Sequence, residues 1–263
     1  MQPYISVFGH VIPLYGVMIV AGVLASIVYI KVCKKRRTFP EADTELALIY
    51  SVIGCFLGAK LLWLLTVWPE FTAELSYLFT NTAAFLQIYM YGGFVFFGGL
   101  IGGLVAAWIY CRVNKLSFYS LAQSLMPVIP LFHAFGRIGC FLMGCCYGCP
   151  SNTFGISYTL SEIAPNGIPL LPVQLIEAVV EFILFAVLAW MAERNVSGKT
   201  MVCTWLISYG ITRFALEYFR GDDYRGFLGT LSVSQVISLV LIGYCAILLL
   251  LEPIKKRFHR KVS

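Results

Sequence analysis

Seven long apolar runs constrain this chain more than any other feature of its sequence. A helix needs about 20 apolar residues to cross a bilayer core about 30 Å thick. The runs that meet this length cover residues 12–30, 46–67, 92–111, 117–136, 172–191, 200–218 and 229–251. Charged residues make up 12% of the chain, whereas soluble domains carry about 25%. The sequence therefore predicts an all-α polytopic membrane protein with about seven transmembrane helices.

The lysines and arginines predict how the chain is oriented in the membrane. Fourteen of the nineteen follow the first, third, fifth and seventh runs, at 31–37, 112–115, 194–199 and 255–261. Because positive residues stay on the cytoplasmic side, we expect the N-terminus outside and the C-terminus in the cytoplasm. No small-residue cleavage site follows the first run, so we expect a retained helix rather than a signal peptide. No linker or repeat is evident, which predicts one domain over 1–263.

The fourth run contains Pro127 and Pro130. Proline lacks the N–H that a helix interior requires. We therefore expect a kinked or partly unwound helix there, with protein or a polar cavity satisfying the freed backbone groups.

Five cations lie away from the cytoplasmic clusters, at membrane depth or near its outer surface. An ionised side chain within the bilayer costs about 2.5–3.5 kcal/mol, so a function or a partner is expected for each. The five residues are Lys60, Arg137, Arg213, Arg220 and Arg225.

The strongest local pattern is Arg213, Glu217 and Arg220, spaced so that a helix would place them on one face. Two guanidiniums around a carboxylate suit a phosphate, with the glutamate holding one arginine in place. A salt-bridge ladder that only anchors the helix end explains the pattern equally well.

A second pattern, His133, Arg137 and Cys140, has the same spacing within a glycine-rich run. His133 is a candidate proton acceptor near neutral pH. The alternative, which we slightly favour, is a histidine bonded to a neighbouring helix.

The fifth run carries Gln174, Glu177 and Glu181 on one helical face. Two carboxylates on an apolar helix need partners, and Lys60 or an outer arginine could serve. Interhelical hydrogen bonding is the favoured role for Glu181. For Glu177, that role and orientation of the site arginines both remain open.

A cysteine cluster follows the fourth run, at Cys140, Cys145, Cys146 and Cys149. The spacing matches zinc ribbons or fingers poorly. We rank a disulfide involving Cys149 or inert thiols first, a reactive thiol beside Arg137 second and a metal third. No metal site and no cofactor are therefore assigned from the sequence.

Small residues are dense from Gly98 to Gly103. Such runs first indicate close helix packing. A glycine-rich helix could also leave room for a lipid headgroup.

These pieces, in this order, resemble the bacterial prolipoprotein diacylglyceryl transferase family over nearly the whole chain. The matching motifs are Ile12-Pro-Leu-Tyr15-Gly16, Gly58-Ala-Lys60-Leu61, Gly98-Gly99-Leu-Ile-Gly102, Gly136-Arg137-Ile-Gly139-x-Phe141-x-x-Gly144, Pro172-Val-Gln174-Leu-Ile-Glu177-Ala178, Arg213-Phe-x-x-Glu217-x-x-Arg220 and Leu231-Ser-Val-Ser-Gln235. The family's topology agrees with the orientation that the positive charges predict.

The resemblance implies an enzyme of the bacterial cytoplasmic (inner) membrane. Such an enzyme moves a diacylglyceryl group from phosphatidylglycerol to the lipobox cysteine of a preprolipoprotein, forming a thioether and releasing glycerol phosphate. Arg137 and Arg213 match arginines that hold the phosphate, and Glu217 and Arg220 belong to the same motif. Further residues within these motifs are expected to line the substrate site: Tyr15, Lys60, Gly98, Gly99, Gly139, Cys140, Gly144, Gln174 and Glu177. Nothing in the chain suggests nucleic acid as a partner.

The chain departs from the family's pattern at several positions. Phe97 stands where the family has a histidine, and Cys140, Met143 and Cys145 stand where it usually has Asn, Asn and Glu. His133, or a tyrosine such as Tyr15, is therefore our candidate for the missing base. Two alternative functions remain: a transferase that uses an anionic phospholipid with another acceptor, and a lipid-binding paralogue without activity.

Overall fold

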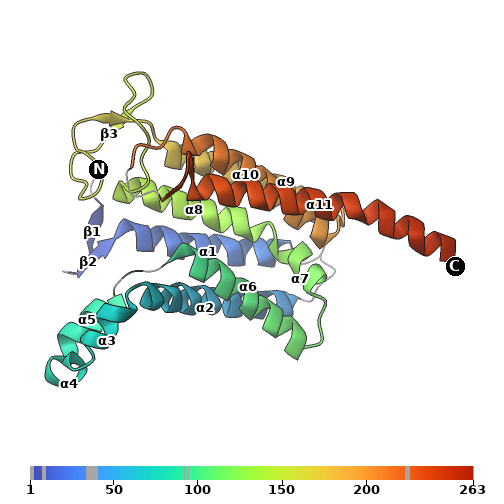
Figure 1. The fold of residues 1–263 in the computed structure, drawn as a ribbon, viewed down its shortest axis with the longest axis horizontal. Helices are drawn as coiled ribbons and strands as arrows, with labels where there is room; N and C mark the ends of the chain where they lie inside the picture. The colour runs from blue at the N-terminus through green and yellow to red at the C-terminus, as the bar shows by residue number, and fades with distance from the viewer. Residues whose placement is uncertain are drawn as a thin grey trace. The chain divides into compact units, whose positions relative to one another are not determined.

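The computed structural model describes residues 3–7, 10–33, 41–91, 93, 95–222 and 226–262 (Figure 1). The chain divides into two compact units. The first comprises residues 1–38 and 122–263, and the second comprises residues 39–121.

The first unit is built from long helices that pack in series. Helix α8 (Val128–Met143) packs against both α1 (Leu14–Val32) and α9 (Val173–Glu193), and α10 (Gly198–Glu217) packs against both α9 and α11 (Val233–Val262). In Figure 1, α8, α9, α10 and α11 run side by side. A core of Leu184, Leu188, Met201 and Trp205 joins α9 to α10. This series brings the polar residues of α8, α9 and α10 to shared interfaces.

The second unit is a helix pair with a short helical segment between its members. It consists of α2 (Glu41–Thr66), α3 (Trp68–Ala73), α4 (Tyr77–Thr80), α5 (Thr82–Tyr91) and α6 (Phe96–Val113). A Cβ added at Gly58 of α2 would lie 2.2 Å from the carbonyl oxygen of Gly98 in α6. Only glycine allows this approach, so the glycine-rich run does pack helices closely, as the sequence predicts.

The proline-containing run forms two helices rather than one. Helix α7 (Phe118–Leu125) and α8 meet at an angle of 46°, and Pro127 is the N-cap of α8. The predicted kink is confirmed. The predicted end at residue 136 is wrong, because α8 continues to Met143.

Short strands, which the hydropathy pattern does not predict, close three loops of the first unit. Antiparallel pairs join β1 (Tyr4–Val7) to β2 (His10–Pro13), β3 (Ile156–Ser157) to β4 (Pro169–Leu170), and β5 (Phe227–Leu228) to β6 (Leu231–Ser232). In the first pair Tyr4 is opposite Pro13.

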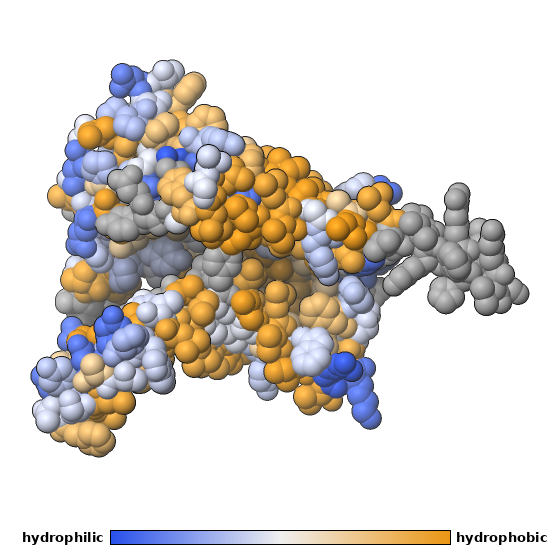
Figure 2. Space-filling model, in the orientation of Figure 1, coloured by the Kyte–Doolittle hydropathy of each residue, from blue (hydrophilic) through white to orange (hydrophobic). Residues whose placement is uncertain are grey.

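Four described helices are long and apolar enough to cross a membrane: Leu14–Val32, Asp43–Thr66, Val173–Glu193 and Val233–Leu250. The bent pair α7–α8 would add a fifth. Figure 2 shows apolar residues gathered over the middle of the helices on the visible face. The structure thus confirms a mostly helical protein with several candidate membrane spans.

Candidate functional site

A buried charge network connects α8, α9 and α10. Arg137 of α8 donates a hydrogen bond through Nη2 to Oε2 of Glu177 on α9. Nη1 of Arg213, from α10, lies 3.7 Å from the same oxygen. Glu177 is 1% exposed and the two arginines are 9% and 8% exposed. One carboxylate therefore lies between two buried guanidiniums on neighbouring helices.

The network continues along α10 into the following loop. Arg213 Nη2 lies 2.8 Å from Glu217 Oε2 and donates a hydrogen bond to Ser234 Oγ, at 3.3 Å. Arg220 Nη1 lies 3.7 Å from the same Glu217 oxygen, and Arg220 Nε donates to Asp222 Oδ1, at 2.8 Å. The predicted pairing of Arg213 with Glu217 is confirmed.

The expectation that one helical face carries Arg213, Glu217 and Arg220 is wrong. Helix α10 ends at Glu217, and the chain turns before Arg220. Arg220 stays near Glu217 because Gly148 forms a β-bridge with it.

Two buried donors of this network have no hydrogen-bond partner among the described residues. They are Arg137 Nε and Arg213 Nη1. A buried polar group without a partner costs free energy, and such groups call for a ligand or water. The network therefore has hydrogen-bonding capacity for an anion.

His133 lies between the two carboxylates of α9. Its Nδ1 is 3.1 Å from Glu181 Oε1, whereas its Nε2 is 3.8 Å from Glu177 Oε1, beyond hydrogen-bond distance. Trp205 Nε1 donates to Glu181 Oε2 at 3.4 Å. His133 of α8 and Trp205 of α10 thus both contact Glu181 on α9, and the hydrogen bond from Trp205 gives Glu181 the interhelical role favoured from the sequence.

Gln174, at the start of α9, fastens the loop that follows α8. Its Nε2 donates to the carbonyl of Cys145 at 2.7 Å and lies 3.5 Å from Tyr158 Oη. Burial raises the pKa of Tyr158 to about 12, although the hydrogen bond from Gln174 lowers it. Gln174 Oε1 is buried without a hydrogen-bond partner in the described part of the chain.

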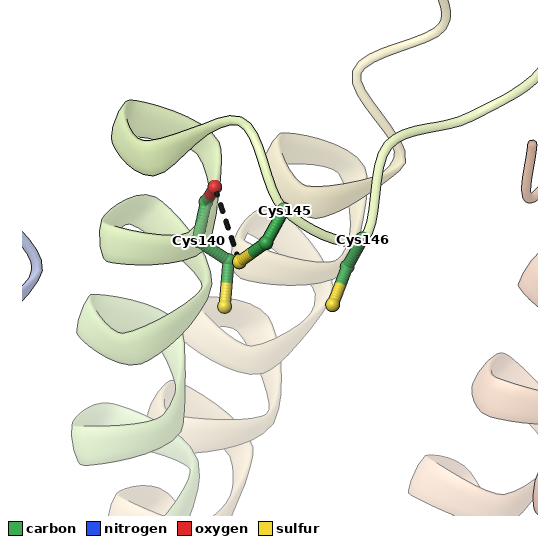
Figure 3. A group of neighbouring side chains, drawn as sticks. All are labelled: Cys140, Cys145 and Cys146. Carbon is green, nitrogen blue, oxygen red and sulfur yellow. Dashed lines mark hydrogen bonds between the residues drawn. The ribbon is translucent and has the colours of Figure 1, made fainter. Parts of the chain in front are cut away.

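The end of α8 brings three cysteines together (Figure 3). Cys140 lies in the last turn of the helix, and Cys145 and Cys146 lie in the loop after it. Their sulfur atoms are all within 4.8 Å of one another. Arg137 Nη1 is 4.0 Å from the sulfur of Cys140. The cluster therefore borders the charge network.

All nine cysteines are described, and all carry free thiols. Of the two alternatives ranked first from the sequence, the structure has free thiols and no disulfide at Cys149. Hydrogen bonds with the Cys140 and Cys145 thiols lower the pKa of Cys146, and the charges of Arg137 and Arg220 lower it further. The pKa of Cys145 is raised, chiefly by its hydrogen bonds with Cys140 and Cys146.

The cysteine loop is held on both sides by backbone hydrogen bonds. Gly148 N–H donates to Leu171 O at 3.0 Å, and Cys149 N–H donates to Phe219 O at 2.8 Å. Gly221 N–H donates to Tyr147 O at 3.0 Å. These bonds place the loop after α8 between the segment before α9 and the segment after α10.

The remaining predicted residues of the first unit also lie at the ends of α1 and α8. A Cβ added at Gly139 would be 2.9 Å from Cδ2 of Tyr15, so α1 and α8 approach closely there. Gly144 has φ +78°, a left-handed conformation that ends α8 and that favours glycine.

Three predicted site residues belong to the second unit: Lys60, Gly98 and Gly99. The structure brings these together on the α2–α6 pair. Lys60 Nζ lies 4.2 Å from the centre of the Trp63 ring, in a cation–π contact. The residues that contact Glu177 and Glu181 in the charge network all come from the first unit. The side chain of Phe97 and all of Arg225 lie outside the described residues.

Sequence reasoning missed Asp222, Ser234, Tyr158 and Trp205. Asp222 could have been found as an acid two residues after a site arginine. Ser234 lies inside the motif at 231–235 but was not singled out. Tyr158 and Trp205 gave no local signal, because their partners Gln174 and Glu181 lie on another helix, α9.

Several apolar helices long enough to span a bilayer, together with a buried arginine–carboxylate network, define the class as a helical membrane protein with a charged interior. Comparison with known sequences is more specific. The chain belongs to the prolipoprotein diacylglyceryl transferase family, whose sequence model matches residues 3–251.

Individual relatives agree along nearly their whole length. A protein named phosphatidylglycerol–prolipoprotein diacylglyceryl transferase from Clostridium tetani is 33% identical over 247 residues, covering 92% of this chain and 95% of the relative. The second protein of that name from Clostridium perfringens is 35% identical, covering 90% of each chain. The protein of that name from Methylococcus capsulatus is 31% identical, covering 89% of this chain and 88% of its own.

Proposed function

We propose that this protein transfers a diacylglyceryl group from phosphatidylglycerol to the lipobox cysteine thiol of a preprolipoprotein. A thioether forms and glycerol phosphate is released. Membership of the family and the names of its relatives support this reaction. The structural observation that carries it is the pair of buried donors without hydrogen-bond partners in the described structure, Arg137 Nε and Arg213 Nη1, because a phosphate supplies the acceptors they need.

Arg137 and Arg213 are the proposed phosphate-binding residues. Each already has a carboxylate beside it, which fixes its position while leaving donors for a ligand. Glu177 would fix the positions of both guanidiniums, and Glu217 would fix those of Arg213 and Arg220. Preorganised cations of this kind stabilise the charge that develops on a leaving phosphate.

His133 is the proposed proton acceptor for the incoming thiol. Its Nδ1 faces Glu181 at 3.1 Å, which favours the tautomer with the proton on Nδ1 and the lone pair on Nε2. A histidine in this tautomer can accept a proton.

The other matched residues are proposed to line the substrates. Gln174, Gly144, Cys140, Gly139 and Tyr15 lie around the end of α8 in the first unit. Lys60, Gly98 and Gly99, on the α2–α6 pair, stay predictions from the family resemblance. The site would thereby hold thiol and lipid in line for displacement.

The chemistry is a substitution at a glycerol carbon. The thiol sulfur forms a bond to the carbon that carries the phosphate, and the carbon–oxygen bond breaks with its electrons passing to the phosphate oxygen. The thiol proton passes to the base. The products are a thioether and glycerol phosphate.

Seven transmembrane spans, an outside N-terminus and a cytoplasmic C-terminus complete the proposal, with residence in the bacterial cytoplasmic (inner) membrane. Helices at all seven apolar runs support the number of spans. A family match that extends over both compact units supports their action as one domain.

The test uses purified protein in bilayers containing phosphatidylglycerol, with a lipobox peptide as acceptor. Mass spectrometry should detect the diacylglyceryl thioether, and glycerol phosphate should appear in equal amount. Arg137→Ala should abolish transfer. Arg194→Ala is the matched control. Arg194 follows the C-terminal end of α9, far along the helix from Glu177, and contacts the Trp190 ring. This variant should therefore transfer normally.

Phosphatidylglycerol bound in an Arg137-dependent way without any transfer to the peptide would contradict the proposed acceptor. It would support one of the two alternatives, another acceptor or a lipid-binding role without activity. Both alternatives remain because Phe97, Cys140 and Cys145 differ from the residues that the family usually has at these positions.

A further inference from the structure

We propose that Cys140, Cys145 and Cys146 bind one zinc ion, and that its fourth coordination position holds the acceptor thiol as a thiolate. This inference rests on the proposed function, because the acceptor it names is the lipobox cysteine. It supplies a chemical reason for three cysteines at the edge of the charge network.

The distances between the sulfur atoms suit a single ion. Sulfurs bound to zinc at about 2.3 Å in a tetrahedron lie about 3.8 Å apart. The three sulfurs here are within 4.8 Å of one another without an ion. Small side-chain rotations would bring them into coordination distance, since Figure 3 shows them on one helix end and the loop beside it.

The backbone has an unusual shape at this point. Gly144 N–H bonds to Phe141 O, and Cys145 N–H bonds to Cys140 O at 3.1 Å, which together make a Schellman turn. Cys146 then has φ +57°, a conformation rare for residues other than glycine and enriched at functional sites. This double turn is what returns the chain so that Cys145 and Cys146 meet Cys140.

The surrounding charges suit an anionic metal site. Three thiolates around Zn²⁺ carry a net charge of −1, and a fourth thiolate makes it −2. Arg137 Nη1 lies 4.0 Å from the Cys140 sulfur, and Arg220 forms a β-bridge with Gly148, two residues after Cys146. These guanidiniums offset the negative charge and also belong to the proposed phosphate site.

The number of ligands indicates a site with an open position. Structural zinc sites have four protein ligands, whereas catalytic ones have three and leave the fourth to water or substrate. Among the described histidines, cysteines and acidic residues, only these three form such a group. All three are partly exposed, so a fourth ligand can approach.

Coordination would prepare the thiol for the transfer. A thiol bound to a cation loses its proton, which would pass by way of water to His133, two helical turns before Cys140 on α8. The bound sulfur forms the bond to the glycerol carbon as the carbon–oxygen bond breaks toward the phosphate. The product thioether is neutral and binds the ion weakly, so it leaves and the position reopens.

Metal content and cobalt absorption test the site without relying on activity. Purified wild type should hold about one zinc per chain, and Cys145→Ser should lose it. Cys149→Ser, a change in the same loop outside the trio, is the matched control and should keep zinc. In cobalt-substituted protein, a lipobox peptide should raise the thiolate-to-metal absorption by about one third, as a fourth sulfur joins three. The same peptide with serine for cysteine should leave the absorption unchanged.

Transfer assays then separate this inference from the function it rests on. Removing zinc with a chelator should abolish transfer from phosphatidylglycerol, and returning zinc should restore it. Wild-type transfer that survives chelation, or that Cys145→Ser retains, would overturn the zinc inference and leave the proposed function standing. A zinc-loaded wild type that transfers nothing to the peptide would refute the proposed function. In that case an unchanged cobalt spectrum with the peptide would overturn the acceptor assignment as well.

Discussion

Glu177 is the carboxylate that both Arg137 and Arg213 contact. The variant Glu177→Gln therefore tests how much its negative charge contributes to the free energy of unfolding. Glu177 is 1% exposed and Arg137 is 9% exposed. In the variant, Arg213 keeps its ion pair with Glu217. Arg137 loses Glu177, its one acidic partner among the described residues. Breaking a buried pair by removing one partner costs about 3–5 kcal/mol. Because the glutamine oxygen still accepts a hydrogen bond, we expect a loss of about 3 kcal/mol, at the low end of that range.

The matched control is Glu181→Gln, one turn further along α9. Glu181 is fully buried, but its partners are His133 and Trp205. Among the described residues, no arginine forms an ion pair with it. An amide oxygen can accept hydrogen bonds from both, so the expected loss is about 1 kcal/mol.

The assay is equilibrium unfolding in mixed micelles, with the double variant Arg137→Gln/Glu177→Gln completing a thermodynamic cycle. Removing both charges leaves no buried guanidinium without its carboxylate. The double variant should therefore be about 2 kcal/mol more stable than the sum of the single effects implies. Equal losses for Glu177→Gln and Glu181→Gln, or strict additivity in the cycle, would refute the reasoning.

Three further predictions follow from individual contacts. Gly58→Leu should destabilise the protein by about 3 kcal/mol in the same unfolding assay, because a Cβ there meets a backbone oxygen at 2.2 Å. The control Gly243→Ala has open space around the new Cβ and should not destabilise the protein. Equal effects of the two changes would disprove close packing at Gly58. Arg213→Lys should lower the rate of transfer about 100-fold in the lipobox-peptide assay, since an ammonium group cannot contact carboxylate and phosphate in a fork; an unchanged rate would remove Arg213 from the site. A membrane-impermeant maleimide added to intact cells should label Cys149 but not Cys33, which follows α1, if the N-terminus is outside; the reverse pattern would invert the topology.

Several features of this protein were determined by the sequence alone, because they depend on residues close together in the chain. Apolar runs predicted helices wherever they occurred, and the two prolines predicted the break between α7 and α8. The spacing of Gln174, Glu177 and Glu181 predicted one buried face of α9, and all three are buried. The pairing of Arg213 with Glu217 followed from helical periodicity.

Only the tertiary structure decided which segments meet at the site. Periodicity placed Arg220 on the helix of Arg213, yet the chain leaves that helix after Glu217, and a bridge to Gly148 sets its position. The sequence analysis ranked a disulfide or inert thiols first, yet a left-handed turn at Gly144 and Cys146 brings three thiols together. Glu177 could be assigned its arginines only when α8, α9 and α10 were packed. Hydropathy and helical period are local properties, whereas loop closure and interhelical ion pairs depend on contacts between residues far apart in the chain, which a single sequence does not encode in any short pattern.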